Sequence, residues 1–237
     1  MNQPKKSIDW VPRTILLLGT DASGKNHVAG LWANKLKELG CDFVVREGAL
    51  GGPVAERSDH GEKGRVSLWM ERGFIFFFPL MKWMVPAVLT LLLHWDAVRF
   101  KPPRHRLLVV SHSALRILAF YLGQSKRYER SKTLPAWLER AIGRVQEVSK
   151  AMVIVLDVDD ETRQQRIENR LREGSIDPFD RFMAADSERS ERIEACLVAI
   201  TRRYYQAYLV ENNDLSDKTL WEEFRKACAD HQRRMAS

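Results

Sequence analysis

A glycine-rich turn near the N-terminus constrains the fold of this chain more than any other feature. It runs from Gly19 to Lys25 with the sequence Gly-Thr-Asp-Ala-Ser-Gly-Lys, after the apolar run Thr14–Leu18 and before a helical stripe that begins at Val28. Its glycines let the backbone curl so that successive N–H groups point inward, and the following helix adds the positive end of its dipole. Lys25 adds a cation, so the sequence predicts a strand–loop–helix unit that binds phosphate.

Further apolar runs of strand length predict the rest of a sheet. The strand candidates are Thr14–Leu18, Phe43–Val45, Leu107–Val110, Met152–Leu156 and, as the weakest, Tyr208–Val210. These runs are continuous rather than alternating, which is typical of strands covered by helices on both faces. Segments of helical period lie between them. We therefore expect an α/β fold with a parallel sheet of about five strands, in a single domain over residues 1–237.

Composition limits the partners and the compartment. The chain has 237 residues, 45% of them hydrophobic, and a net charge of +7. A positive charge suits an anionic partner such as a nucleotide phosphate, a nucleic acid or an acidic membrane face, although a solvated basic surface explains it equally well. No nucleic-acid recognition module is visible, so we rank that partner low.

The cysteines and the N-terminus favour the cytoplasm. Cys41, Cys196 and Cys228 are odd in number and have no metal-ligand spacing, which argues against a disulfide framework and against a zinc site. Residues 1–7 are polar and lack the apolar stretch of a signal peptide. We expect a cytoplasmic protein, with membrane association left open by the next feature.

One apolar segment, within residues 66–100, departs from the alternating plan and reads as an insertion. Its stretch from Gly73 to Leu93 approaches the length of a membrane span, but Lys82 lies at its middle and Pro79 and Pro86 interrupt it. A buried helical hairpin that packs on the core is the first interpretation. The second is a contact with a membrane surface or a partner protein through Phe74–Trp95, and a true span ranks last.

Several segments resemble the thymidylate kinases, a P-loop nucleoside monophosphate kinase family. The family's phosphate loop carries an acid where this chain has Asp21, and Val45–Pro53 is similar to its Arg-Glu-Pro-Gly-Gly segment. Val153–Val158 with the arginines that follow is similar to its fourth strand and the helix before the lid, and Asp180–Phe182 resembles part of the lid itself. The resemblance covers most of the chain outside the insertion and the termini, and it implies a P-loop nucleotide-kinase fold.

The resemblance also implies roles for individual residues. ATP would be bound by Gly19, Thr20, Asp21, Ala22, Ser23, Gly24, Lys25 and Asn26. The acceptor would contact Asp21, Arg46, Glu47 and His112. Catalysis would rest on Lys25, Arg166, Arg170 and Arg181, the last in a candidate lid over residues 174–185. Arginines carried by a lid can stabilise the charge that develops on a migrating phosphoryl group.

Two departures from the family pattern fall at the Mg²⁺ site. Asn26 stands where a serine or threonine hydroxyl is usual, and its amide oxygen is a weaker candidate ligand. The third strand ends in Ser111 and His112, where the family has an acid and an arginine. His112 can still donate to a phosphate, most strongly when protonated.

Two functions therefore compete. The first is ATP- and Mg²⁺-dependent phosphoryl transfer to a nucleotide or related small acceptor. The second is a non-catalytic nucleotide-binding regulatory protein with a degenerate metal site. The acceptor and a homodimeric state are left open by the sequence.

Overall fold

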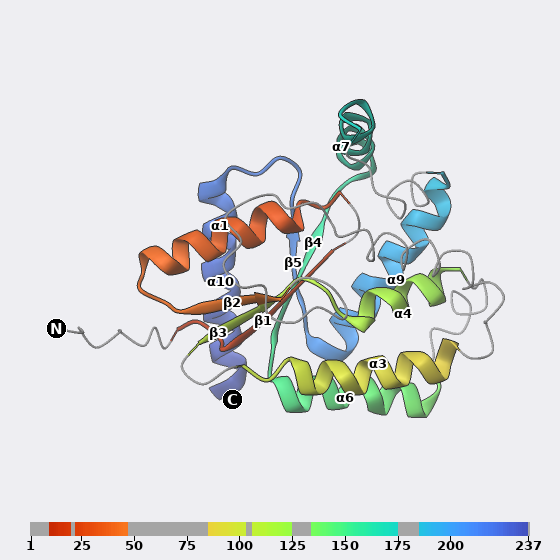
Figure 1. Ribbon diagram of the computed structural model, residues 1–237, viewed down its shortest axis with the longest axis horizontal. Helices are drawn as coiled ribbons and strands as arrows, with labels where there is room; N and C mark the ends of the chain where they lie inside the picture. Colours follow the sequence, from red (N-terminus) through yellow and green to blue (C-terminus); the bar gives the residue numbers. More distant parts are fainter. Residues whose placement is uncertain are drawn as a thin grey trace.

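Five parallel strands form the central sheet of the computed structural model (Figure 1), which describes residues 10–19, 22–46, 85–102, 106–124, 134–174 and 185–236. The strands are β1 (Thr14–Gly19), β2 (Phe43–Arg46), β3 (Leu107–Val110), β4 (Met152–Asp157) and β5 (Tyr208–Glu211). They lie in the order β2-β3-β1-β4-β5, and every neighbouring pair is parallel. The expected α/β class and five-stranded parallel sheet are confirmed, including the weakest strand candidate.

Helices cover both faces of this sheet. The described helices are α1 (Lys25–Glu38), α3 (Val85–Arg99), α4 (Ala114–Gly123), α6 (Ala136–Ser149), α7 (Asp160–Arg172), α9 (Ser187–Tyr205) and α10 (Asp217–Ala236), and all of them except α7 pack on the sheet. One hydrophobic cluster joins a face of the sheet to α1 and α10, and a larger one joins the opposite face to α3, α4, α6 and α9. Helix α7 lies apart from these layers, beyond the end of β4 (Figure 1).

The central strand shows why its sequence is apolar throughout. Leu16 and Leu18 are buried in the larger cluster, whereas Ile15 and Leu17 are buried in the smaller one. Successive side chains of a strand point to opposite faces, so a strand with helices on both sides needs an apolar residue at every position.

The strand order places the glycine-rich loop where a ligand is expected. In the common doubly wound dinucleotide- and flavin-binding orders the second strand lies beside the first, whereas here β3 separates β2 from β1. The connection from β3 to β4 crosses to the other side of β1. Ligands of open α/β sheets bind outside the carboxyl ends of the strands where the winding changes direction, and the loop that follows β1 lies at this position.

The described part of the apolar segment is a helix that packs one of its sides against the core. Residues 85–99 form α3, whose Leu89 and Leu93 are fully buried in the larger cluster beside α4 and α6. Residues 66–84, the remainder of the expected insertion before α3, lie outside the described ranges. Within those ranges, no helix combines the length and the apolar character needed to cross a bilayer.

Candidate functional site

The glycine-rich loop closes around the side chain of Lys25. Its Nζ donates to the carbonyl oxygen of Gly19 at 2.9 Å and lies 3.4 Å from Oγ of Ser23. Two loop residues have left-handed backbones, Ala22 with φ of 58° and Gly24 with φ of 82°, and Gly24 caps the N-terminus of α1. The loop is therefore a tight ring with its lysine folded back over it. Thr20 and Asp21, which complete the ring in sequence, lie outside the described residues.

Both glycines of the loop are required by close packing. A Cβ at Gly24 would lie 2.6 Å from Nδ2 of Asn212. A Cβ at Gly19 would lie 2.6 Å from Oγ of Ser23 and 2.8 Å from the carbonyl oxygen of Leu156. These distances are shorter than any side chain tolerates, so the loop is held tightly against the ends of β4 and β5.

Asn212 directly follows the edge strand β5, and its side chain holds the glycine-rich loop in place. Its Nδ2 donates to the carbonyl oxygen of Ser23 at 2.8 Å, and its backbone N–H donates to the carbonyl oxygen of Asp157 at 2.7 Å. The residue is buried. Sequence reasoning missed it, although the polar run from Asn212 to Asp214 after a strand candidate is the signal that could have found it.

Arg166 of α7 reaches the same loop, as its expected catalytic role requires. Its guanidinium donates to the carbonyl oxygens of Ala22 (3.1 Å) and Asn212 (2.9 Å) and to a carboxylate oxygen of Asp214 (2.9 Å). Two of these three contacts are backbone carbonyls at the loop or at the end of β5. Arg166 thus lies beside the glycine-rich loop and ties α7 to it.

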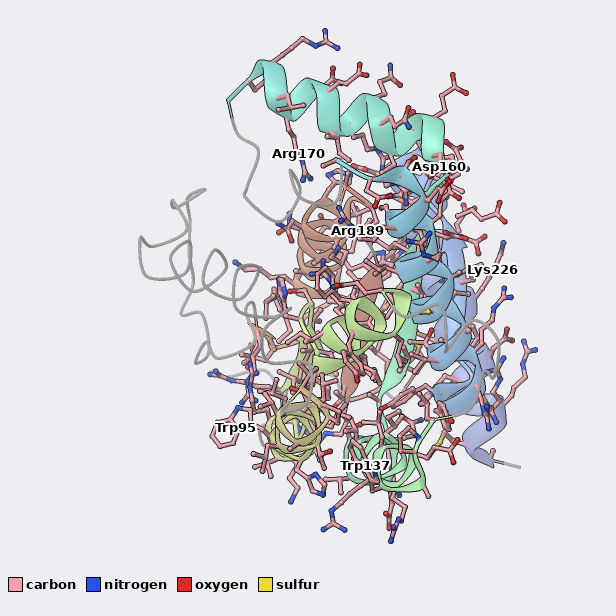
Figure 2. All side chains as sticks on the ribbon, turned by 90° about the vertical axis from the view of Figure 1, so that its right-hand side faces the viewer. Trp95, Trp137, Asp160, Arg170, Arg189 and Lys226 are labelled. Carbon is pink, nitrogen blue, oxygen red and sulfur yellow. The ribbon has the colours of Figure 1, made fainter. Side chains whose placement is uncertain are left out.

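The other arginines of α7 differ in their surroundings. Arg163 is buried and forms ion pairs with Asp160 and with Glu194 of α9, so it attaches α7 to the larger helical layer. Arg170 is half-buried and projects from α7 toward the body of the molecule (Figure 2). Arg181 and most of the candidate lid lie outside the described residues.

On the expected acceptor side, Arg46 ends β2 next to a second arginine. Its Nη1 donates to the carbonyl oxygen of Arg99 at the end of α3, while its Nε is buried and has no hydrogen-bond partner among the described residues. Burial, and then the charge of Arg99, lower the pKa of Arg46. An unpartnered buried donor in a positive environment is suited to an anion.

The end of β3 lies beside Arg46. Ser111 is buried, and both its N–H and its hydroxyl lie within bonding distance of the carbonyl oxygen of Arg46, at 3.3 and 3.5 Å. His112 is half-buried, with Nδ1 3.4 Å from Nη1 of Arg116 on α4. The structure therefore brings Arg46 beside Ser111, and His112 is the next residue along the chain. Glu47 lies outside the described residues.

A buried acid that sequence reasoning overlooked supports this corner. Asp96 of α3 accepts hydrogen bonds from Oγ of Ser113 (2.9 Å) and the N–H of Ala114 (2.6 Å), and it lies 3.9 Å from Arg99. Burial raises its pKa to about 6, although both hydrogen bonds and Arg99 act in the opposite direction. The signal was an acid and an arginine at helical spacing in an otherwise apolar helix.

The chemistry of the described donors suits phosphate better than a bare metal ion. Asn26, the expected metal ligand, is exposed in the first turn of α1. Across the described ranges, no three acidic, histidine or cysteine side chains gather as a metal cluster. By contrast, the loop combines Lys25, a helix N-terminus and left-handed turns that orient N–H groups inward.

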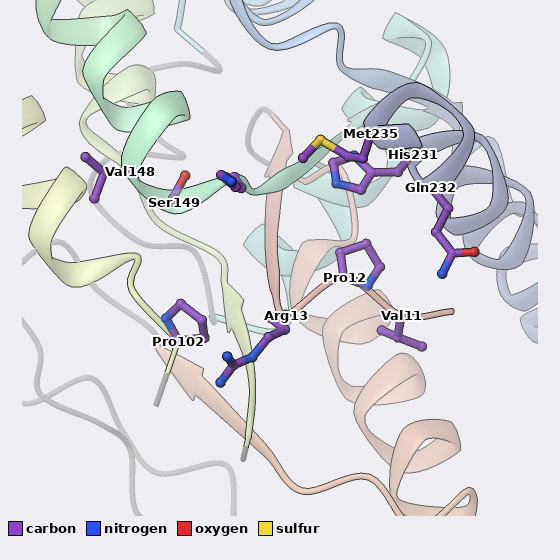
Figure 3. Close-up of a pocket in the computed structure, with 10 residues that line it drawn as sticks. Val11, Pro12, Arg13, Pro102, Val148, Ser149, His231, Gln232 and Met235 are labelled. Carbon is purple, nitrogen blue, oxygen red and sulfur yellow. The ribbon is translucent and has the colours of Figure 1, made fainter. Parts of the chain in front are cut away.

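A pocket of about 360 Å³ lies at the opposite edge of the sheet (Figure 3). Its lining includes Arg13 just before β1, Lys150 just before β4 and His231 of α10. Burial, and then Arg234, lower the pKa of His231. Because Arg13 and Lys150 precede their strands, this pocket lies at the amino ends of β1 and β4, away from the loop at the carboxyl end of β1.

Comparison with known proteins adds no identification. No protein-family model matches the chain, and no curated protein matches it significantly.

Proposed function

We propose that the protein is an ATP-dependent phosphotransferase of the thymidylate kinase type, which transfers a phosphoryl group to a nucleotide or a related small acceptor. The observation that carries the proposal is the loop between β1 and α1. Lys25, the only side chain cation inside that ring among the described residues, folds back onto the carbonyl oxygen of Gly19. This arrangement fits the phosphates of a nucleotide.

The donor side follows from the loop. N–H groups of Ala22 to Lys25 and the N-terminus of α1 would hold the outer phosphates, with Lys25 as the neutralising cation. ATP supplies the phosphoryl group, and Mg²⁺ would bind chiefly through the phosphates, with Asn26 as a weak protein ligand. The hydrogen bond from Arg166 to the carbonyl oxygen of Ala22 supports a role for this arginine in stabilising charge on the migrating group, and Arg170, one turn further along α7, would act with it.

The acceptor side follows from the corner formed by β2 and β3. The buried Nε of Arg46 has no hydrogen-bond partner in the part of the chain that the structure describes, and Arg99 lies beside this side chain. His112 and Arg116 add further donors at the start of α4. Such a positive corner supports an acceptor that itself carries a phosphate, with Asp21 and Glu47 expected to contact its remaining groups.

A sharp test compares Lys25→Ala with the wild-type chain. Loss of a charge-assisted contact of about 1.5–3 kcal/mol should weaken ATP binding roughly 10- to 100-fold. Isothermal titration measures the affinity, and a coupled assay with a panel of nucleoside monophosphates measures turnover with and without Mg²⁺. Lys226→Ala on α10 is the control, because Lys226 is exposed and forms an ion pair with Glu223 within its own helix. Equal ATP affinity in all three proteins would sink the proposal.

The regulatory alternative has its own support. Asn26 is exposed and Ser111 directs its hydroxyl to a backbone carbonyl, so neither replaces the family's metal-organising groups directly. Binding of ATP that depends on Lys25, without turnover on any acceptor of the panel, would favour a non-catalytic nucleotide-binding protein over a kinase.

A further inference from the structure

The outward face of α3 is apolar apart from His94. Its exposed residues are Ala87, Val88, Leu91, His94, Trp95 and Val98. Leu91 is 71% exposed, Val98 63% and Trp95 54%. Val88, Leu91, Trp95 and Val98 have the spacing of one helix face. The two charged residues of the helix, Asp96 and Arg99, are both buried, so the exposed surface of α3 carries no acid, lysine or arginine.

Basic residues border this face. Helix α6 packs beside α3, and its exposed charged residues are Arg140, Arg144 and Glu147, followed by the exposed Lys150 at its C-terminal cap. Lys101 and Arg106, which follow α3, are exposed as well. Trp137 of α6 is 38% exposed, and Figure 2 shows it in the lower part of the molecule, where Trp95 projects from the neighbouring α3 on the left. The surface of α3 and α6 thus combines an apolar stripe, two tryptophans and a net positive rim.

We propose that this α3–α6 surface binds the face of an anionic membrane, with α3 lying in the plane of the interface. An apolar helix face enters the boundary between headgroups and acyl chains, and tryptophan favours that boundary because its ring is apolar while its N–H is polar. The arginines of α6 would meet the lipid phosphates. Apolar area and basic charge act together, which a stable peripheral contact requires.

The dimensions of α3 agree with an in-plane helix. Its 15 residues span only about 22 Å, short of the ~30 Å hydrocarbon core. Its opposite side is committed to the protein core through Leu89 and Leu93. The helix therefore has one face for the protein and one for the membrane.

Charge favours a membrane over a second copy of the chain. A two-fold contact presents the same patch twice, so it would bring two basic rims toward each other. Anionic headgroups instead neutralise Arg140 and Arg144. The α3–α6 surface also lies along the lower edge in Figure 1, whereas α7 lies at the upper edge, so membrane binding leaves the phosphate loop accessible.

Vesicle sedimentation of the full chain tests this inference, and it needs no nucleotide, so its outcome is independent of the proposed function. The vesicles are phosphatidylcholine with and without phosphatidylserine. Leu91→Gln/Trp95→Gln should weaken binding to the mixed vesicles at least about tenfold. Met235→Gln is the matched control, because Met235 is a 55% exposed apolar residue on α10, and it should bind like the wild type.

A second variant tests the charge separately. Arg140→Gln/Arg144→Gln should weaken binding roughly fivefold for each charge removed, and only on vesicles that contain phosphatidylserine. The four side chains substituted in the two variants are all exposed, so the thermal unfolding midpoint of each variant should match that of the wild type. If one variant unfolds at a lower temperature, the vesicle binding of the other variant decides the test.

Three results would overturn the inference. One is wild-type protein that stays in solution with both kinds of vesicle. Another is equal binding by the wild type and both variants. The third is a wild-type dimer that Leu91→Gln/Trp95→Gln converts to a monomer without vesicle binding by either, which would assign the surface to a second copy.

Discussion

The buried carboxyl group of Asp96 makes stability depend on pH in a definite direction. Its pKa is raised from 3.8 to about 6 by burial, so between these values the folded state binds the proton more tightly than the unfolded state. Asp96 therefore contributes stability that is full below about pH 4 and is lost as the pH rises to about 6. The pKa of Asp96 rises from 3.8 to about 6. At about 1.36 kcal/mol per pH unit, this rise corresponds to about 3 kcal/mol of unfolding free energy.

The perturbation that isolates this effect is Asp96→Asn. The amide oxygen can still accept from the N–H of Ala114 and the hydroxyl of Ser113, but the side chain no longer titrates. Other acids titrate alike in both proteins, so the difference in unfolding free energy cancels them. Relative to the wild type, the variant should gain about 3 kcal/mol between pH 4 and pH 7.

Urea unfolding followed by tryptophan fluorescence at half-unit pH steps measures this difference, because Trp32 is fully buried against Phe224. A difference that stays constant across the range would refute the reasoning. It would mean that the hydrogen bonds and Arg99 offset burial fully and hold Asp96 at its ordinary pKa.

Two further predictions concern the loop and the attachment of α7. Asn212→Asp replaces the donor 2.8 Å from the carbonyl oxygen of Ser23 by a carboxylate oxygen and adds a negative charge beside the loop. The affinity for ATP, measured by titration, should therefore fall at least about tenfold. An unchanged affinity would show that this contact does not shape the loop. Glu194→Ala removes one of the two acids that pair with the buried Arg163 among the described residues, and the other, Asp160, is half exposed. The unfolding free energy should fall by about 3 kcal/mol. A loss below about 0.5 kcal/mol would show that the pair acts as an ordinary surface ion pair.

The sheet could be predicted from the sequence because its strands are buried on both faces. Runs such as Met152–Leu156 have no polar position, and this continuity is visible without any structure. The observed strands β1, β2, β4 and β5 each end one residue later than expected, and the bounds of β3 agree with the expectation. Gly19, for example, belongs to β1 because its backbone still pairs with Leu156, although glycine gives no strand signal of its own.

The partners of the loop could not be predicted in the same way. Ser23 and Asn212 are 189 residues apart, and the contact between them depends on the order of β1, β4 and β5 in the sheet. The role of Asp96 could not be predicted either. An acid in an apolar helix has no evident function in the sequence, and its partners Ser113 and Ala114 become neighbours only in the fold. Local sequence reports period and propensity, whereas these contacts depend on which strand ends become neighbours.

The end of β3 shows how the two departures from the family pattern bear on catalysis. Ser111 carries no charge and directs its hydroxyl to the carbonyl oxygen of Arg46. Asp96 is a described acid close to this strand end, but it belongs to α3. Its carboxylate already accepts hydrogen bonds from the hydroxyl of Ser113 and from the N-terminus of α4. An acid committed to holding a helix end is not placed to organise a metal and its water. The proposed binding of phosphate by the loop does not need that acid, but efficient Mg²⁺ chemistry would. The dependence of turnover on Mg²⁺ is therefore the measurement that separates a kinase from a protein that only binds nucleotide.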